Sequence, residues 1–254
     1  RTRVSFEVGM YQLGGQALFL SNRDLQIGRG EPIKDTARVL SRYLDGVMIR
    51  TFGHEIVEEF AQYASIPVIN ALTDLLHPCQ ALTDLLTAQE HKGKDLKGLK
   101  MAYIGDGNNM THSLMYACAK VGMNFASASP KGYEPNAQVV ANAKLDAAQS
   151  GSTIEILNDP FKAAKDADIL YTDVWASMGQ EAEHDERVKI FKDYQINNEL
   201  LRVADKRAIV MHCLPAHRGE EIAEDVLEKN ANVIFDEAEN RLHTQKAIMA
   251  LLMG

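Results

Sequence analysis

Short apolar stretches alternate with longer amphipathic ones along most of the chain. The short stretches are rich in β-branched residues and predict strands, whereas the longer ones repeat apolar residues every three or four positions and predict helices. The predicted strands are 16–20, 47–49, 67–70, 100–104, 125–128, 153–157, 169–171, 209–211 and 233–235. The predicted helices are 1–10, 36–44, 55–64, 78–91, 111–121 and 240–253. Strands that alternate with helices predict parallel sheets with helices on both faces.

The predicted strands are too many for one compact sheet, which favours two α/β domains. The segment 92–98 is polar, contains two glycines and separates two series of strands and helices. We therefore expect one domain at 1–91 and another at 99–240, each a parallel sheet flanked by helices. The last helix, within 241–254, is expected to pack back on the first domain.

Charge and cysteine content exclude several classes of protein. The 254 residues include 27 Lys and Arg against 35 Asp and Glu, so the net charge is −8. This balance argues against a nucleic-acid partner or an anionic membrane surface. No apolar run approaches the roughly 18 residues of a membrane span. The 3 cysteines lack CxxC spacing, which argues against a disulfide framework or a structural zinc site and indicates a reducing compartment.

The start of the chain has the features of an anion site. A helix is predicted from the first residue without a capping residue before it, so its first N–H groups need other partners. Arg1 and Thr2 stand at this end, where free N–H groups and the helix dipole favour negative charge. Either a preceding segment supplies the missing partners or a ligand does. A solvated basic start is the plain alternative.

Polar residues follow several predicted strands, at the sheet edge where open α/β sheets bind ligands. Arg50 follows one strand and suits phosphate or carboxylate. Asp173 follows another, and with Ser177 it can hold an ammonium. Cys213 follows a third and is a nucleophile, a base or only a packed thiol. Surface ion pairing and helix capping are the structural alternatives for Arg50 and Asp173.

Two helix starts add further candidates. Pro78 is a typical first helical residue, so His77 is expected near the N-cap, where the helix dipole disfavours its protonated form. A neutral His77 would donate a hydrogen bond to a polarised oxygen, or it serves as a cap. Gln80 shares that end of the helix. Arg241, near the start of the last helix, is another candidate anion ligand.

Residues 105–110 resemble a dinucleotide-binding fingerprint but depart from it. Two glycines follow a predicted strand, yet Met110 stands where the third small residue is required. A NAD-dependent dehydrogenase is therefore disfavoured. Two asparagines at the helix start suit a carboxylate better, and Asn109 is our candidate for that role.

Taken in order, these segments resemble the aspartate/ornithine carbamoyltransferase family, and within it the ornithine type. The resemblance spans the whole chain. Its motifs are Arg1-Thr2-Arg3, His77-Pro78-Cys79-Gln80, Asp106-Gly107-Asn108-Asn109, Asp173-Val174-Trp175-Ala176-Ser177-Met178-Gly179, His212-Cys213-Leu214-Pro215 and Glu239-Asn240-Arg241. In the family a further segment, ending in a Ser-Thr pair, precedes the first motif. The resemblance thus implies that the first domain is N-terminally incomplete here.

The resemblance implies transfer of the carbamoyl group of carbamoyl phosphate to the δ-amine of L-ornithine. The products would be L-citrulline and phosphate, a step of arginine metabolism that needs no cofactor or metal. The catalytic residues it implies are Arg50, His77, Asp173 and Cys213. The residues implied to bind carbamoyl phosphate are Arg1, Thr2, Gln26, Arg50, His77, Gln80, Cys213, Leu214 and Arg241. Those implied to bind ornithine are Asn109, Asp173, Ser177 and Met178.

The resemblance has consequences beyond the site. It implies a homotrimer in which Gln26 reaches the site of a neighbouring subunit, and a cytoplasmic enzyme, or one of the mitochondrial matrix if a lost start carried a transit peptide. It also predicts a cis Leu214–Pro215 peptide bond. Two alternatives stay open: a carbamoyltransferase for another amine such as putrescine, and an inactive homologue that only binds small molecules.

Overall fold

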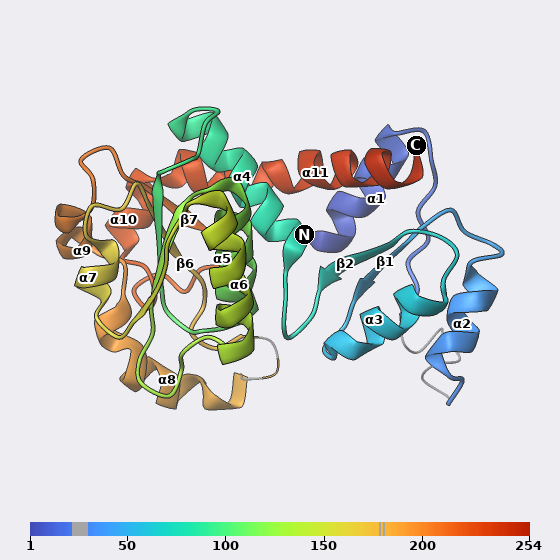
Figure 1. Cartoon of the computed structure of the whole chain (residues 1–254), viewed down its shortest axis with the longest axis horizontal. Coiled ribbons are helices and arrows are strands. Elements are labelled where there is room, and N and C mark those ends of the chain that lie inside the picture. Colours follow the sequence, from blue (N-terminus) through green and yellow to red (C-terminus); the bar gives the residue numbers. More distant parts are fainter. Residues whose placement is uncertain (22–29, 178, 180) are drawn as a thin grey trace. The chain divides into compact units, whose positions relative to one another are not determined.

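The computed structural model describes residues 1–21, 30–177, 179 and 181–254. Two compact units divide the chain (Figure 1). The first unit comprises Arg1–Cys79 and Arg241–Gly254, and the second comprises Gln80–Asn240. Within the part of the chain that the structure describes, no helix is both long and apolar enough to cross a membrane. The predicted domain limits of 1–91, 99–240 and 241–254 stay predictions beside these units.

Within the residues that the structure describes, the first unit contains a small parallel sheet and several helical segments. The strands are β1 (Val47–Arg50) and β2 (Val68–Leu72), which pair in parallel. The helices are α1 (Thr2–Gln12), α2 (Ile33–Leu40), α3 (His54–Tyr63) and the last part of α11 (Ala231–Met253). Helix α2 begins three residues before and ends four residues before its predicted limits of 36–44. Helices α1 and α3 lie close to their predicted positions, because their apolar residues recur with helical spacing.

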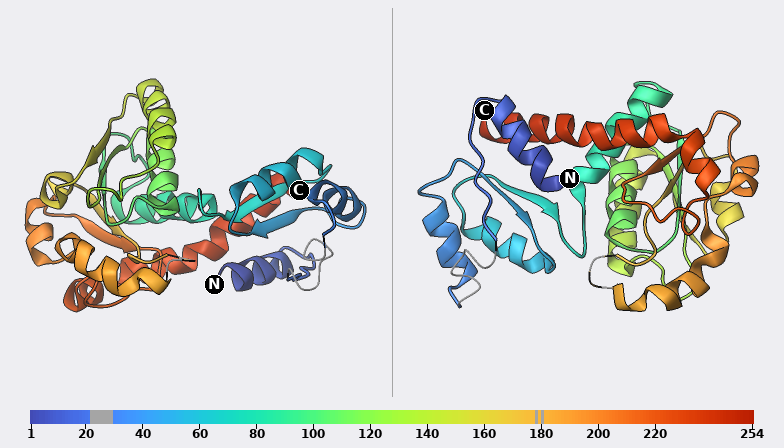
Figure 2. Two further views of the ribbon diagram at one scale, coloured as in Figure 1. Left: turned by 90° about the horizontal axis from the view of Figure 1, so that it is seen from below. Right: turned by 180° about the vertical axis from the view of Figure 1, so that it is seen from behind.

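Helix α1 packs against the last part of α11 (Figure 2). Phe6 of α1 and Met249 of α11 are both buried, in a cluster with Ile69 and Ala71 of β2. Gly9 lies at this contact, where a Cβ would come within 3.0 Å of the methyl carbon of Met249 and that side chain would have to shift. The packing fixes the first turn of α1, which carries Thr2.

The second unit is a five-stranded parallel sheet covered by helices. The strand order is β5-β4-β3-β6-β7, with every pair parallel. The strands are β3 (Lys100–Ile104), β4 (Asn124–Ala128), β5 (Ile154–Leu157), β6 (Ile169–Thr172) and β7 (Ile209–His212). The helices are α4 (Pro78–Lys92), α5 (Asn109–Val121), α6 (Ala137–Ser150), α7 (Pro160–Ala164), α8 (His184–Phe191), α9 (Asn198–Val203), α10 (Glu224–Lys229) and the first part of α11, with short 3₁₀ turns at η2 (Glu181–Glu183) and η3 (Lys192–Tyr194). The predicted α/β class is confirmed.

Successive residues of each strand enter different cores, because side chains alternate across a sheet. Met101 and Tyr103 of β3 face helices α4, α5 and α6, whereas Ala102 and Ile104 face the side of α7 to α10. Both faces of the sheet are therefore buried. This burial explains why the strands read as continuous apolar runs in the sequence.

Helix α5 shows how local sequence sets an element's ends. The side chain of Asn108 accepts hydrogen bonds from the backbone N–H groups of Met110 and Thr111, which caps the first turn. Gly122 ends the helix in a left-handed conformation, with φ of 79°. The cap places Asn108 at the carboxyl end of β3.

Two of the predicted strands are wrong. Residues 16–20 form no strand, and Leu18, Phe19 and Leu20 are exposed. The apolar run there does not pair with a neighbouring strand of the described sheets. Residues 233–235 belong to helix α11, which begins at Ala231 rather than at 240. Val233 and Ile234 face the two different cores of the second unit, and a short apolar run reads the same in a helix as in a strand.

We expect Gly107 to be essential to the turn after β3. A Cβ at this position would overlap the backbone of Glu134 and Pro135 and would lie 2.6 Å from the carbonyl oxygen of Tyr133. Gly107→Ala should therefore lower the free energy of unfolding by about 3 kcal/mol. Denaturant unfolding measures this loss.

Gly132→Ala is the matched control for this prediction. Gly132 has φ of 89° and open space around it, so alanine meets only backbone strain of about 1 kcal/mol. Equal losses in the two variants would contradict the steric explanation.

Candidate active site

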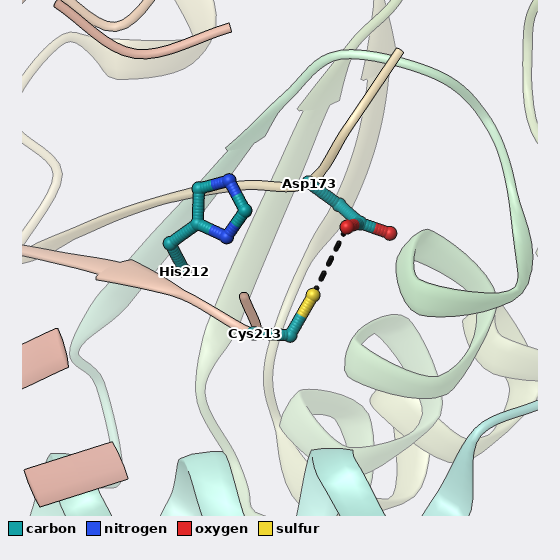
Figure 3. Close-up of side chains that lie close together, drawn as sticks. All are labelled: Asp173, His212 and Cys213. Atoms are coloured by element: carbon teal, nitrogen blue, oxygen red, sulfur yellow. Dashed lines mark hydrogen bonds between the residues drawn. The ribbon is translucent and has the colours of Figure 1, made fainter. Parts of the chain in front are cut away.

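The carboxyl ends of three adjacent strands bring polar side chains together in the second unit. Asn108 follows β3, Asp173 follows β6 and Cys213 follows β7. The Cys213 thiol donates to Asp173 Oδ1 at 3.0 Å, as Figure 3 shows. The Asn108 amide donates to Asp173 Oδ2 at 3.3 Å and to the Ser177 hydroxyl at 3.2 Å. The parallel sheet thus assembles one cluster from residues far apart in sequence.

Asp173 is the centre of this cluster. Its side chain is buried, and its Oδ1 also accepts the backbone N–H of Val174 at 2.8 Å. A carboxylate accepts up to about four hydrogen bonds, and in this arrangement the donors on it are an amide, a thiol and a backbone N–H. Such a carboxylate is fixed in orientation and suits a cationic ligand, in agreement with the proposed ammonium site.

The environment of Cys213 disfavours its thiolate form. Burial raises the pKa of the Cys213 thiol well above its ordinary value of 9.0, and the nearby charge of Asp173 raises it further. A thiol with a raised pKa is a poor nucleophile and a poor proton acceptor at neutral pH. Of the three roles left open by the sequence, the structure therefore disfavours both nucleophile and base.

His212 orients the backbone after β7 rather than activating Cys213. Its Nδ1 accepts the N–H of Leu214 at 2.9 Å, so the proton lies on Nε2, which donates to Glu221 Oε1 at 2.9 Å. These two bonds occupy both ring nitrogens. Leu214 has φ of 52°, a left-handed conformation that its bond to His212 stabilises. The predicted cis Leu214–Pro215 bond is confirmed.

A buried carboxylate is hydrogen-bonded to the backbone at the end of β7. Glu237 of α11 accepts the backbone N–H of His212 at 2.9 Å through Oε2. Its Oε1 accepts from the Tyr171 hydroxyl and from the Gln80 amide, both at 3.1 Å. Burial raises the pKa of Glu237 well above its ordinary 4.5, and the charge of Asp84 adds to the rise. Gln80 also donates to Asp84 at 2.8 Å.

An ion pair fixes the loop that leads from Asp173 to Ser177. The Arg187 guanidinium donates to Asp106 Oδ2 and to the carbonyl oxygen of Trp175, both at 2.9 Å. Asp106 and Arg187 are both buried. Burial raises the pKa of Asp106 to about 6, against the opposing effect of Arg187. Sequence reasoning missed Arg187, because it ends a charged run that looks solvated.

A cationic cluster gathers around Thr2 in the first unit. The Thr2 hydroxyl accepts from Arg50 Nη1 at 2.9 Å and from Arg241 Nη2 at 3.2 Å. Burial lowers the pKa of Arg50, and the positive charges of Arg241 and Arg1 lower it further. Cations that repel one another at a helix N-terminus favour an anion there. The structure thus brings the predicted phosphate ligands Arg1, Thr2, Arg50 and Arg241 together.

His77 lies beside these arginines and directly precedes α4. Its side chain is buried, and burial lowers its pKa well below the ordinary 6.5. The charges of Arg241, Arg50 and Arg1 lower the pKa further. The pKa of His77 is thus lowered, as expected for a neutral imidazole, and the largest cause is burial rather than the helix dipole. Pro78 is the first residue of α4, as predicted.

Comparisons with known proteins identify the family of each part of the chain. Residues 1–90 match the carbamoyl-P binding domain of the family described as aspartate/ornithine carbamoyltransferase, and residues 97–252 match its Asp/Orn binding domain. The chain belongs to this family. Both parts of the family's architecture are represented in the sequence.

Individual relatives are similar over the whole chain. The ornithine carbamoyltransferase of Anoxybacillus flavithermus is 64% identical over 253 residues, which are 100% of this chain and 80% of that protein. That of Thermococcus kodakarensis is 60% identical over 254 residues, again 100% of this chain and 80% of the relative. The solved structure of ornithine carbamoyltransferase from Pyrococcus furiosus has a TM-score of 0.95 at 57% identity, covering 100% of this chain and 80% of that one.

Of the remaining site residues that the family resemblance implies, some lie outside the described residues and the others lie near Asp173 or at the start of α5. Gln26 and Met178 lie outside the described residues, so their roles stay predictions. Asn109 is the first residue of α5, and Ser177 accepts from Asn108. Asn108 is the asparagine that contacts Asp173, and the sequence analysis missed it. Its signal was present, since an Asn before a helix is a typical N-cap.

A metal ion at the strand ends is disfavoured. The ligand atoms of Asp173, His212 and Cys213 lie within 4.8 Å of one another. Binding an ion there would require His212 to release Leu214 or Glu221 and Cys213 to lose its proton. The arrangement thus suits a hydrogen-bonded cluster rather than a metal centre.

The lowered pKa of His77 predicts a pH dependence of stability. Below about pH 6.5 the unfolded chain binds a proton at His77 that the folded protein does not, so the free energy of unfolding falls as the pH decreases. This contribution amounts to at most about 1.4 kcal/mol per pH unit. His77→Gln removes it, and the variant should show a shallower decrease between pH 6.5 and 5.

The comparison of slopes, measured by denaturant unfolding at each pH, decides this prediction. His91→Gln serves as the control, because His91 is a partly exposed histidine paired with Asp236. Parallel curves for the wild-type protein and His77→Gln would show that His77 does not resist protonation.

Proposed function

We propose that this protein transfers the carbamoyl group of carbamoyl phosphate to the δ-amine of L-ornithine, giving L-citrulline and phosphate. The observation that carries the proposal is a cationic cluster around Thr2 and a carboxylate cluster around Asp173, in a chain at least 60% identical over its whole length to two ornithine carbamoyltransferases. The two clusters match the two ends of the reaction, a phosphate dianion and an amino acid.

The cationic cluster serves the phosphate and the carbamoyl oxygen. Arg1, Thr2, Arg50 and Arg241 hold the phosphate, whose negative charge relieves the repulsion among the arginines. His77, as a neutral imidazole, donates to the carbamoyl oxygen together with Thr2 and Arg50. These donors stabilise the negative charge that develops on this oxygen when the amine attacks the carbon.

Two acceptors orient the carbamoyl NH2 group. The carboxamide oxygen of Gln80 and the backbone carbonyl of Leu214 accept its hydrogens. The Gln80 amide nitrogen is held by Asp84 and Glu237, which fixes the direction of its oxygen. His212 fixes Leu214 through its N–H. The δ-amine lone pair then attacks the carbamoyl carbon, the bond from carbon to the phosphate oxygen breaks, and its electrons leave with phosphate.

The cluster around Asp173 holds the head group of ornithine. Asp173 and Ser177 accept from the α-ammonium, while Asn109 and the Met178 backbone bind the α-carboxylate. Asn108 fixes both Asp173 and Ser177 through its amide. A charged acceptor beside amide donors favours an α-amino acid over putrescine, which has no carboxylate.

Cys213 orients the substrate amine without taking part in covalent chemistry. Its raised pKa keeps the sulfur protonated at neutral pH, and the thiol proton is directed to Asp173. The sulfur lone pairs accept weakly from the δ-amine. Ornithine therefore reacts in the form whose δ-amine is already neutral, and the proton released on carbamoyl transfer passes to water.

The assembly proposed for the protein is a homotrimer in which Gln26 contributes to a neighbouring site. The support is the resemblance of the chain to the family. Light scattering tests it, with three times the chain mass expected. The domain limits predicted from the sequence and a cytoplasmic location belong to the same proposal.

Colorimetric measurement of citrulline tests the activity. With carbamoyl phosphate, we expect the protein to carbamoylate ornithine in preference to putrescine or aspartate offered in parallel. Arg50→Ala should reduce kcat/KM by roughly 30-fold or more, since loss of one partner of a charge-assisted contact costs about 2–5 kcal/mol.

Arg38→Ala is the matched control, because Arg38 is an exposed arginine of the first unit paired with Asp35. Preference for putrescine would identify the alternative carbamoyltransferase, and binding of both substrates without turnover would identify an inactive homologue.

The role of Cys213 has its own test. Cys213→Ser should lower kcat by roughly 10- to 100-fold through misplacement of the amine. The pH dependence of kcat should keep its shape, because the thiol does not titrate in the working range. Loss of a titration step from the pH profile would instead make Cys213 a proton acceptor, and a trapped carbamoyl-cysteine would make it a nucleophile.

A further inference from the structure

In the second unit, two histidines and a glutamate lie close to one another, and none of the three is assigned to a substrate. His184 is the first residue of α8, while His217 and Glu220 lie in the turn that follows Pro215. His184 Nε2 lies 3.0 Å from Glu220 Oε2, and His217 Nδ1 lies 3.5 Å from the same oxygen. One ligand atom from each of the three residues lies within 4.8 Å of the other two.

These distances suit a small divalent ion. In a tetrahedral zinc site with bonds of about 2.0–2.1 Å, neighbouring ligand atoms are separated by about 3.3–3.4 Å. The observed 3.0 and 3.5 Å bracket this separation. The two imidazole rings lie edge to face, with centroids 5.6 Å apart, and both have a nitrogen close to Glu220 Oε2.

Hydrogen bonds hold the turn in this conformation. The backbone N–H of Glu220 donates to the backbone carbonyl oxygen of His217 at 2.9 Å, and the Gln195 amide donates to the carbonyl oxygen of Glu220 at 2.8 Å. The buried Glu221 accepts the backbone N–H of His217 at 2.7 Å. The positions of two of the three ligands are thus fixed before any ion arrives, which reduces the entropy lost on binding.

His184 is oriented by a second carboxylate. Its Nδ1 lies 3.4 Å from Asp185 Oδ1, and a ring nitrogen that faces a carboxylate can only donate to it. Histidines that bind metals usually donate their other ring nitrogen to a carboxylate in this way. In the absence of an ion Nε2 donates to Glu220, and the contact with Asp185 and the charge of Glu220 raise the pKa of His184. A bound ion would replace the Nε2 proton, while the contact of Nδ1 with Asp185 would remain.

We propose that His184, His217 and Glu220 form a binding site for a divalent transition-metal ion of the zinc type. Two imidazoles and one carboxylate are ligands that zinc and cobalt accept, whereas magnesium and calcium require oxygen ligands. Water completes the fourth position. The ion is not part of the proposed reaction, so this inference stands or falls independently of the proposed function.

The ion would link two segments that begin at the substrate residues. The chain runs from Asp173 and Ser177 to His184, and from Cys213 and Leu214 to His217. A metal bridge would hold α8 against the 217–220 turn. We expect slower hydrogen exchange in 182–191 and 216–222 when the ion is bound, because opening of either segment would require dissociation of the metal.

Cobalt(II) spectroscopy and zinc competition test the proposal on the full chain without an affinity tag. The experiment uses the Cys213→Ala background, which removes the thiol ligand from a second group among the described residues, Asp173, His212 and Cys213. Cobalt should bind with one-to-one stoichiometry and give the visible absorption of a tetrahedral site, and zinc should displace it. His184→Gln and His217→Gln should each weaken binding by roughly tenfold or more.

His91→Gln is the matched control, since His91 pairs with a single carboxylate, Asp236. This substitution should leave cobalt binding unchanged. Circular dichroism of each variant confirms that it is folded. Absence of binding in the background protein would overturn the site and leave the three residues as an ordinary ion pair. Binding that His184→Gln and His217→Gln leave unchanged would overturn it as well, by placing the ion elsewhere.

Discussion

The parallel register of β3, β6 and β7 is the constraint on which the amino-acid site depends. These three strands are neighbours in the sheet, and all of them run in the same direction. Asn108, Asp173 and Cys213 therefore leave the sheet at one edge and meet within hydrogen-bond distance. A shift of one residue in any strand would turn its side chains to the other face and separate the cluster.

Buried polar groups hold this edge in place, and each is hydrogen-bonded. Glu237 supports the end of β7, Glu221 fixes the tautomer of His212, and Arg187 ties the loop after β6 to Asp106. Burial of such groups is unfavourable unless they are paired. Their concentration beneath one sheet edge is consistent with selection for the geometry of a site rather than for stability alone.

The strands and helices of this protein could be predicted from the sequence better than the hydrogen bonds that orient its site residues. Most strands and helices followed from hydrophobic periodicity, and the residues at strand ends were visible as polar positions after apolar runs. Residues 233–235 were assigned wrongly, because a short apolar run does not distinguish a buried strand from a helix that packs on two sides.

The contacts that orient the site could not be read from the chain, because they join distant residues. Arg187 lies in a charged run and Glu237 on a helix, and only the fold shows that both are buried. Asn108 and Asn109 are adjacent and chemically identical, so the choice between them depended on the helix cap. The family resemblance supplied the substrates, which periodicity and spacing alone left open.

The central claim is that the edge formed by β3, β6 and β7 binds the head group of the amino-acid substrate. The most direct measurement is a crystal structure of the protein with carbamoyl phosphate and an ornithine analogue that lacks the δ-amine and therefore cannot react. We expect the α-ammonium of the analogue within hydrogen-bond distance of the Asp173 carboxylate and the Ser177 hydroxyl. An α-ammonium bound to other residues, with Asp173 bonded only to Cys213, Asn108 and Val174, would contradict the claim.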